Sequence, residues 1–124
     1  MNKQTSAKNS LLKSFRYAFR GLLFLFSERN FRIHILATIL VVLFGFIFQI
    51  EKEEWFIVLI LIGVVMGFEA INTCLEAICD FISPNFDERI KKIKDMAAAA
   101  VLIVAIVAAI IGIILFLPYI TCCI

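Results

Sequence analysis

The sequence lacks several signatures by which enzymes are often recognised. It has no P-loop, no glycine-rich kinase loop and no His-x-Glu metal motif. Its four cysteines suggest no disulfide framework, and none has zinc-ligand spacing with His34, the single histidine. The first residues contain no compact apolar region followed by a small-residue cleavage site, so we expect no signal peptide. Any chemistry must therefore rest on other polar residues.

Hydrophobic residues, by contrast, are in excess. They make up 63% of the 124 residues, with a mean hydropathy of +1.02, whereas a soluble domain is about half apolar. An amphipathic surface helix is expected at about residues 10–26, after a frayed polar start, with Lys13 on its basic face. Because the apolar excess falls into three blocks, we predict a single-domain, all-α membrane protein with spans at about residues 33–50, 55–82 and 96–118. So small a subunit cannot enclose a large cavity, which favours a homo-oligomer.

The basic residues predict the orientation of the chain in the membrane. Seven Lys and Arg residues precede the first span and four lie in the predicted loop at residues 83–95. The turn between the first two spans has only Lys52, and the C-terminal tail has none. By the positive-inside rule, the N-terminus and the 83–95 loop lie in the cytoplasm and the C-terminus lies outside. We therefore expect a multi-pass membrane protein.

Polar residues gather late in the second span, where the surrounding sequence is apolar. On a helix that turns about 100° per residue they share an arc of about 80°, and they are Glu69, Asn72, Glu76 and Asp80. Ionisable groups at membrane depth are costly, so a shared face indicates a functional site. Glu69 lies deepest, about one turn inside the apolar region, which gives it the most desolvated carboxylate. It is therefore our candidate for a general base.

Two further polar clusters fall at the same cytoplasmic membrane depth. Glu28 stands just before the first span, and Lys94 and Asp95 stand just before the third. Carboxylates, an asparagine and a lysine suit Mg-nucleotide chemistry, because Mg²⁺ binds one or two carboxylates together with phosphates and waters. We expect Glu28 and Glu76 to bind metal and Lys94 to contact phosphate. We expect Asp95 or Asp80 to orient Lys94 or a metal-bound water.

Structural roles are the alternative for each of these residues. Buried acids can hydrogen-bond between subunits, Lys94 and Asp95 can form an interfacial charge pair, and His34 can be a packed or hydrogen-bonded histidine. Gly63 and Gly67 have the spacing of a helix-packing surface. A proton-coupled transporter is an alternative function, although its acid is expected nearer the membrane midplane. A purely structural membrane subunit leaves the shared carboxylate face unexplained.

At these polar residues the sequence resembles the bacterial integral-membrane diacylglycerol kinase family. The resemblance covers about residues 11–118 and is carried by three motifs in the right order, at residues 28–32, 69–80 and 94–103. It implies a homotrimer whose subunits each have a surface helix and three transmembrane helices. The resemblance also implies ATP and Mg²⁺ as co-substrate and cofactor, and no nucleic acid partner. It implies a location in the bacterial inner membrane, with active sites at the cytoplasmic membrane surface between subunits.

The resemblance also implies roles for individual residues. Glu69 matches the catalytic base, Asn72 a polar residue beside it, and Asp80 an acidic active-site position. Among the remaining matches are the magnesium-binding glutamates (Glu28, Glu76), the nucleotide-site pair (Lys94, Asp95) and a surface-helix lysine near the γ-phosphate (Lys13). Ala99 departs from the glycine that many relatives carry. Residues 32–34, 51–55 and 94–98 look more like the undecaprenol kinase branch, with diacylglycerol as the alternative lipid substrate.

Overall fold

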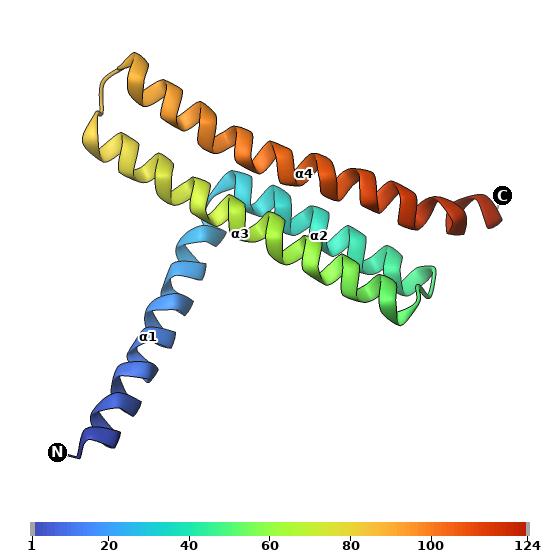
Figure 1. Ribbon diagram of the computed structural model, residues 1–124, viewed down its shortest axis with the longest axis horizontal. Coiled ribbons are helices and arrows are strands. Elements are labelled where there is room, and N and C mark those ends of the chain that lie inside the picture. The colour runs from blue at the N-terminus through green and yellow to red at the C-terminus, as the bar shows by residue number, and fades with distance from the viewer. Residues whose placement is uncertain (1, 124) are drawn as a thin grey trace.

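The computed structural model describes residues 2–123, and over that range all of the regular secondary structure is helical. Figure 1 shows α2, α3 and α4 running side by side as a bundle, with α1 diverging steeply from it. Three of the helices, α2, α3 and α4, are long and apolar enough to cross a membrane, as predicted. In chain order the four helices are α1 (Lys3–Phe26), α2 (Arg29–Ile47), α3 (Lys52–Ile82) and α4 (Glu88–Cys122).

The first helix begins earlier than the sequence pattern indicated. It starts at Lys3 rather than near residue 10, because residues 3–9 include no proline or glycine that would interrupt a helix. It packs only lightly against α2, where the rings of Phe26 and Phe31 meet edge to face at 5.9 Å. Its side chains are otherwise almost all exposed, and the chain turns into α2 at Ser27 and Glu28.

A tight turn joins α2 to α3 and is closed by side chains at both sides. Gln49 adopts a left-handed backbone conformation with φ of 52°. Glu51 then caps α3 in a reciprocal capping box with Glu54, each side chain accepting from the other residue's backbone N–H. Beside the turn, the indole of Trp55 packs directly over the backbone of Gly45. These contacts fix how far α2 and α3 are offset along their common axis.

The connection between α3 and α4 is shorter than predicted. The predicted loop at residues 83–95 is wrong in its second half, because Asp87 accepts the backbone N–H groups of Arg89 and Ile90 and so starts α4 at Glu88. The predicted end of the last span, near Pro118, is not the end of the helix. Pro118 lies inside α4, which continues for about one more turn to Cys122.

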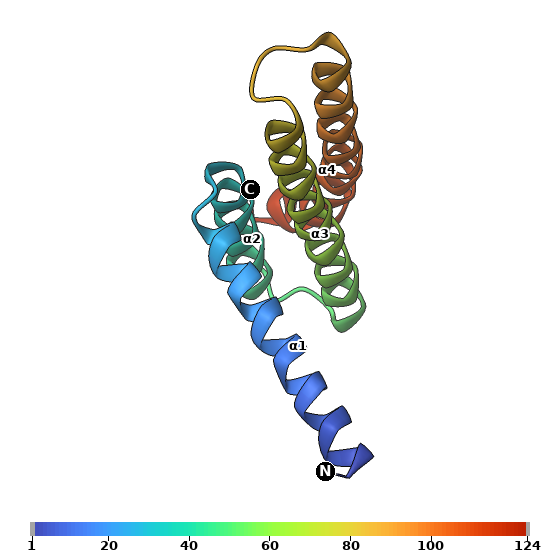
Figure 2. The same ribbon diagram turned by 90° about the vertical axis from the view of Figure 1, so that its left-hand side faces the viewer.

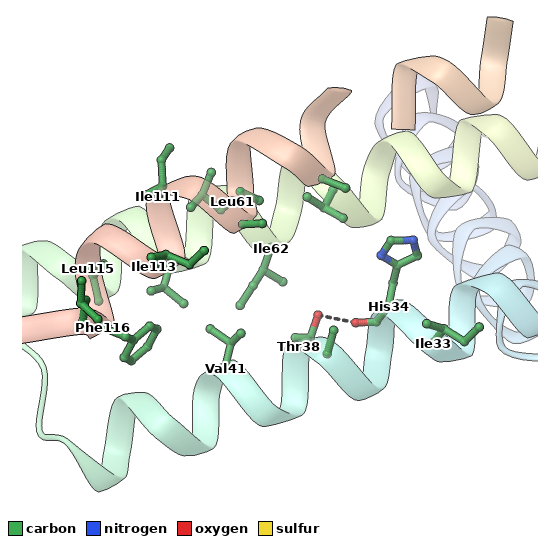
Figure 3. Close-up of a pocket in the computed structure, with 18 of the residues that line it drawn as sticks. Ile33, His34, Thr38, Val41, Leu61, Ile62, Ile111, Ile113, Leu115 and Phe116 are labelled. Atoms are coloured by element: carbon green, nitrogen blue, oxygen red, sulfur yellow. Dashed lines mark hydrogen bonds between the residues drawn. The ribbon is translucent and has the colours of Figure 1, made fainter. Parts of the chain in front are cut away.

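The small buried core lies at the end of the bundle far from α1. It consists of Ile50, Val58 and Leu115, covered by aromatic rings that include Phe48 and Tyr119. The Tyr119 hydroxyl donates to Glu54, which ties the end of α4 to the start of α3. Most other large apolar side chains are exposed, as expected of helices that face lipid or one another across subunits. A cavity of about 640 Å³ with an almost wholly apolar wall lies between α2, α3 and α4 and extends from His34 to the core residues Val58 and Leu115 (Figure 3).

Candidate functional site

Two polar side chains are buried within the described part of the chain, and both belong to the predicted site. Glu69 is 3% exposed and Asn72 is 5% exposed, on adjoining turns of α3. Burying polar groups is unfavourable unless they are hydrogen-bonded, so the partners of these two side chains indicate their role. Both residues lie in the half of α3 nearer its loop to α4, and the sequence predicts that this half is on the cytoplasmic side.

The Glu69 carboxylate faces α2. Its Oε2 atom lies 3.5 Å from Nε2 of His34, which projects from α2 towards α3 in Figure 3. The backbone carbonyl of His34 accepts the Thr38 hydroxyl at 2.8 Å, and the carbonyl of Glu69 accepts the Thr73 hydroxyl at 3.0 Å. These backbone contacts leave the imidazole and the carboxylate free to interact with each other. The sequence had marked His34 as packed or hydrogen-bonded and did not connect it with Glu69.

Asn72 pairs with the next acid of the helix after Glu69. Its side-chain Nδ2 donates to Oε1 of Glu76, one turn further on, at 3.1 Å. Two acceptor atoms at the site, Glu69 Oε1 and Asn72 Oδ1, are buried and have no hydrogen-bond donor within residues 2–123. Buried acceptors are rarely left without a donor, and those that are point to a ligand, an ion or a water. The pair of unsatisfied oxygens is the strongest structural sign of a binding site in this chain.

Beside the loop that connects them, α3 and α4 are joined by a charge pair. Lys94 donates to Asp80 on α3 at 2.8 Å. Asp95 instead accepts from Lys91, one turn earlier on α4, at 2.8 Å. The structural alternative in which Lys94 and Asp95 pair with each other is therefore not observed, because neighbouring residues on a helix point in different directions. Asp80 is exposed, so the polar face of α3 runs from a buried end at Glu69 to a solvated end.

The two remaining predicted residues lie apart from this cluster in a single subunit. Glu28 is exposed where the chain enters α2, and its side chain does not cap that helix. Lys13 is exposed on α1, which Figure 2 shows extending away from the other helices. Neither side chain forms an ion pair within residues 2–123. Over the same residues, no three or more His, Cys, Asp or Glu side chains gather closely enough to hold a metal ion by themselves.

Comparisons with known proteins identify the family. A family model described as "Prokaryotic diacylglycerol kinase" matches residues 16–116. The chain is 38% identical to an undecaprenol kinase of Bacillus subtilis, over 89% of this chain and 90% of that protein. It is 38% identical to a diacylglycerol kinase of Synechocystis, over 88% of this chain and 63% of that protein, and 30% identical to one of Escherichia coli, over 89% and 91%. The chain therefore belongs to the prokaryotic diacylglycerol kinase family, a family of membrane lipid kinases that act as phosphotransferases.

Proposed function

We propose that this chain is an ATP- and Mg²⁺-dependent kinase for the primary hydroxyl of a membrane lipid, with undecaprenol as the favoured substrate. The undecaprenol kinase of Bacillus subtilis, similar over nearly its whole length, supports that choice of lipid. Diacylglycerol is the alternative, since one relative named diacylglycerol kinase, that of Synechocystis, reaches the same identity. Both lipids present a hydroxyl at the headgroup layer, where the polar end of α3 is expected.

The observation that carries this proposal is the free Oε1 atom of Glu69. In the reaction, the lipid hydroxyl oxygen attacks the γ-phosphorus of ATP, and the bond between that phosphorus and the bridging oxygen of ADP breaks. The hydroxyl proton leaves as the new bond forms and needs an acceptor at that point. Glu69 Oε1 is buried, carries no donor within residues 2–123, and lies where apolar surroundings weaken the solvation of a carboxylate. It is suited to take that proton.

The remaining residues fit a magnesium nucleotide. Mg²⁺ prefers oxygen ligands and needs only one or two carboxylates when phosphates and waters complete its shell. Glu76 and the unsatisfied Asn72 Oδ1 present such oxygens beside Glu69, with Glu28 as the second predicted carboxylate. The ion, when bound, would offset charge on the transferring phosphate. Lys94 provides a cation at the same end of α3, held in place by Asp80.

We further propose that the kinase is a homotrimer with active sites between subunits. Glu28 and Lys13 support this arrangement, because neither finds an ionic partner within residues 2–123 of its own subunit. The orientation is that given by the basic residues, with the N-terminus and the α3–α4 loop in the cytoplasm of a bacterial cell and the C-terminus outside. The polar end of α3 then faces the compartment that holds ATP.

Transfer of ³²P from γ-labelled ATP tests the proposal directly. The purified protein, in detergent micelles with Mg²⁺, is given undecaprenol and diacylglycerol in parallel. We expect label on undecaprenol first, and a loss of about 100-fold or more in Glu69→Gln, the range for removing a general base. Glu53→Gln, an exposed glutamate at the other end of α3, is the matched control and should retain activity. Folded protein that labels neither lipid would overturn the kinase assignment.

A further inference from the structure

The single histidine of the chain lies beside the buried carboxylate. His34 Nε2 and Glu69 Oε2 are 3.5 Å apart, with the histidine side chain about a quarter exposed and the glutamate side chain almost fully buried. The two residues lie on different helices, so their approach depends on how α2 packs on α3. No other side-chain donor within residues 2–123 reaches the Glu69 carboxylate. The two oxygens therefore differ, since Oε2 faces an imidazole and Oε1 faces no donor.

We infer that His34 is a positioning residue for Glu69. In this arrangement Nε2–H donates to Oε2, which fixes the plane of the carboxylate and leaves Oε1 for the lipid hydroxyl. The inference rests on the proposed kinase function for its consequence in catalysis. The contact itself rests on the geometry of the two side chains.

The physical basis is the cost of an unpaired carboxylate in apolar surroundings. A free Glu side chain has several rotatable bonds, and without a donor it would rotate towards any available water. A histidine on the neighbouring helix removes that freedom, as outer partners do for catalytic carboxylates and metal ligands elsewhere. At 3.5 Å the contact is longer than a closed hydrogen bond, and catalytic hydrogen bonds often tighten only when substrate is bound.

The location of His34 favours this role over simple packing. Its side chain stands on the wall of the cavity between α2, α3 and α4, and nearly all of that wall is apolar. An aliphatic residue would fill the same place without the cost of burying part of an imidazole. What an aliphatic residue could not provide is a donor to Glu69. A test must therefore separate the volume of the side chain from its N–H group.

Three variants make that separation in the ³²P assay. His34→Leu keeps apolar volume and removes the donor, His34→Gln places an amide N–H near the position of Nε2, and Thr38→Val removes a hydroxyl from the same cavity wall. We expect kcat to fall by about 10–100-fold in His34→Leu, with the KM values for ATP and lipid changed by less than about threefold. His34→Gln should recover most of kcat, and Thr38→Val should stay near wild type. Equal losses in the Leu and Gln variants would overturn the inference.

A second measurement does not depend on activity. Because the chain has one histidine, labelling with ¹⁵N-imidazole histidine gives the NMR signals of His34 alone. We expect Nε2 to carry the proton and its resonance to move in Glu69→Gln, while Glu53→Gln leaves it unchanged. An Nε2 resonance whose chemical shift is the same in Glu69→Gln as in the wild type would refute the contact. If wild-type protein transfers no phosphate, the proposed function fails, and this spectrum still decides whether His34 and Glu69 are paired.

Discussion

Gly45 is the position where one methyl group should disturb the bundle most. A Cβ atom built there would lie 2.6 Å from Cη2 and 2.9 Å from Cζ2 of Trp55, well inside van der Waals contact. Alanine in a helix gains about 0.5–1 kcal/mol over glycine. Overpacking of this kind costs about 1–3 kcal/mol, so the clash wins. We expect Gly45→Ala to lower the free energy of unfolding by up to about 2.5 kcal/mol, the largest clash cost less the smallest helical gain.

Thermal unfolding in detergent, followed by circular dichroism, measures this change. Gly112→Ala is the matched control, because a Cβ atom there meets nothing within 4 Å, and its melting temperature should stay level or rise. Trp55→Phe removes the ring atoms that clash, so Gly45→Ala should cost less in that background. A double-mutant cycle then gives a coupling energy of about 1 kcal/mol between the two residues. A Gly45→Ala protein as stable as wild type, or a cycle without coupling, would refute the contact.

Three other substitutions test separate features of the fold. Gln49→Gly should stabilise the protein by up to about 1 kcal/mol in denaturant unfolding, because the left-handed conformation at that turn is unfavourable for a residue with a Cβ atom. The Arg89 guanidinium holds the pKa of Asp87 below its usual value, so the loss of melting temperature in Asp87→Ala should be full above about pH 4 and shrink as the pH falls through the lowered pKa. Gly63→Leu adds a large side chain on an open face of α3 and should reduce the trimer fraction in chemical cross-linking, whereas retention of the trimer would remove Gly63 from the proposed subunit interface.

The helical hairpins explain which contacts the sequence could have revealed. In an antiparallel pair, residues equally far from the turn lie at the same height. Asp80 and Lys94 lie seven residues to either side of Asp87, and they pair. Glu54 and Tyr119 are nearly symmetric about the same point, and they also pair. The register of α3 against α4 therefore follows from the loop position, and so does the choice of Asp80 over Asp95 as the partner of Lys94.

In the α2–α3 hairpin the same symmetry predicts the depth of a residue but not the direction of its side chain. His34 and Glu69 lie at similar distances from the turn near Glu51, so their equal depth was predictable. Whether the imidazole points at α3 or at lipid depends on the rotation of α2. That helix is apolar on all sides, and its sequence therefore carries little information about which face packs inward. For this reason the sequence did not predict the partner of Glu69, whereas it did predict the polar face of α3.

The residues without partners support a site assembled from more than one subunit. Within residues 2–123 of one chain, Glu69 Oε1 and Asn72 Oδ1 have no donor, and the exposed Glu28 has no ionic partner. Membrane helices gain little from burying apolar surface against one another, so close backbone approach and polar contacts must hold subunits together. Gly63 and Gly67 leave such an approach open on the helix that carries Glu69. If subunits pack along this face, the interface and the active site are built from the same helix, and a change that separates subunits should abolish phosphate transfer even with Glu69 intact.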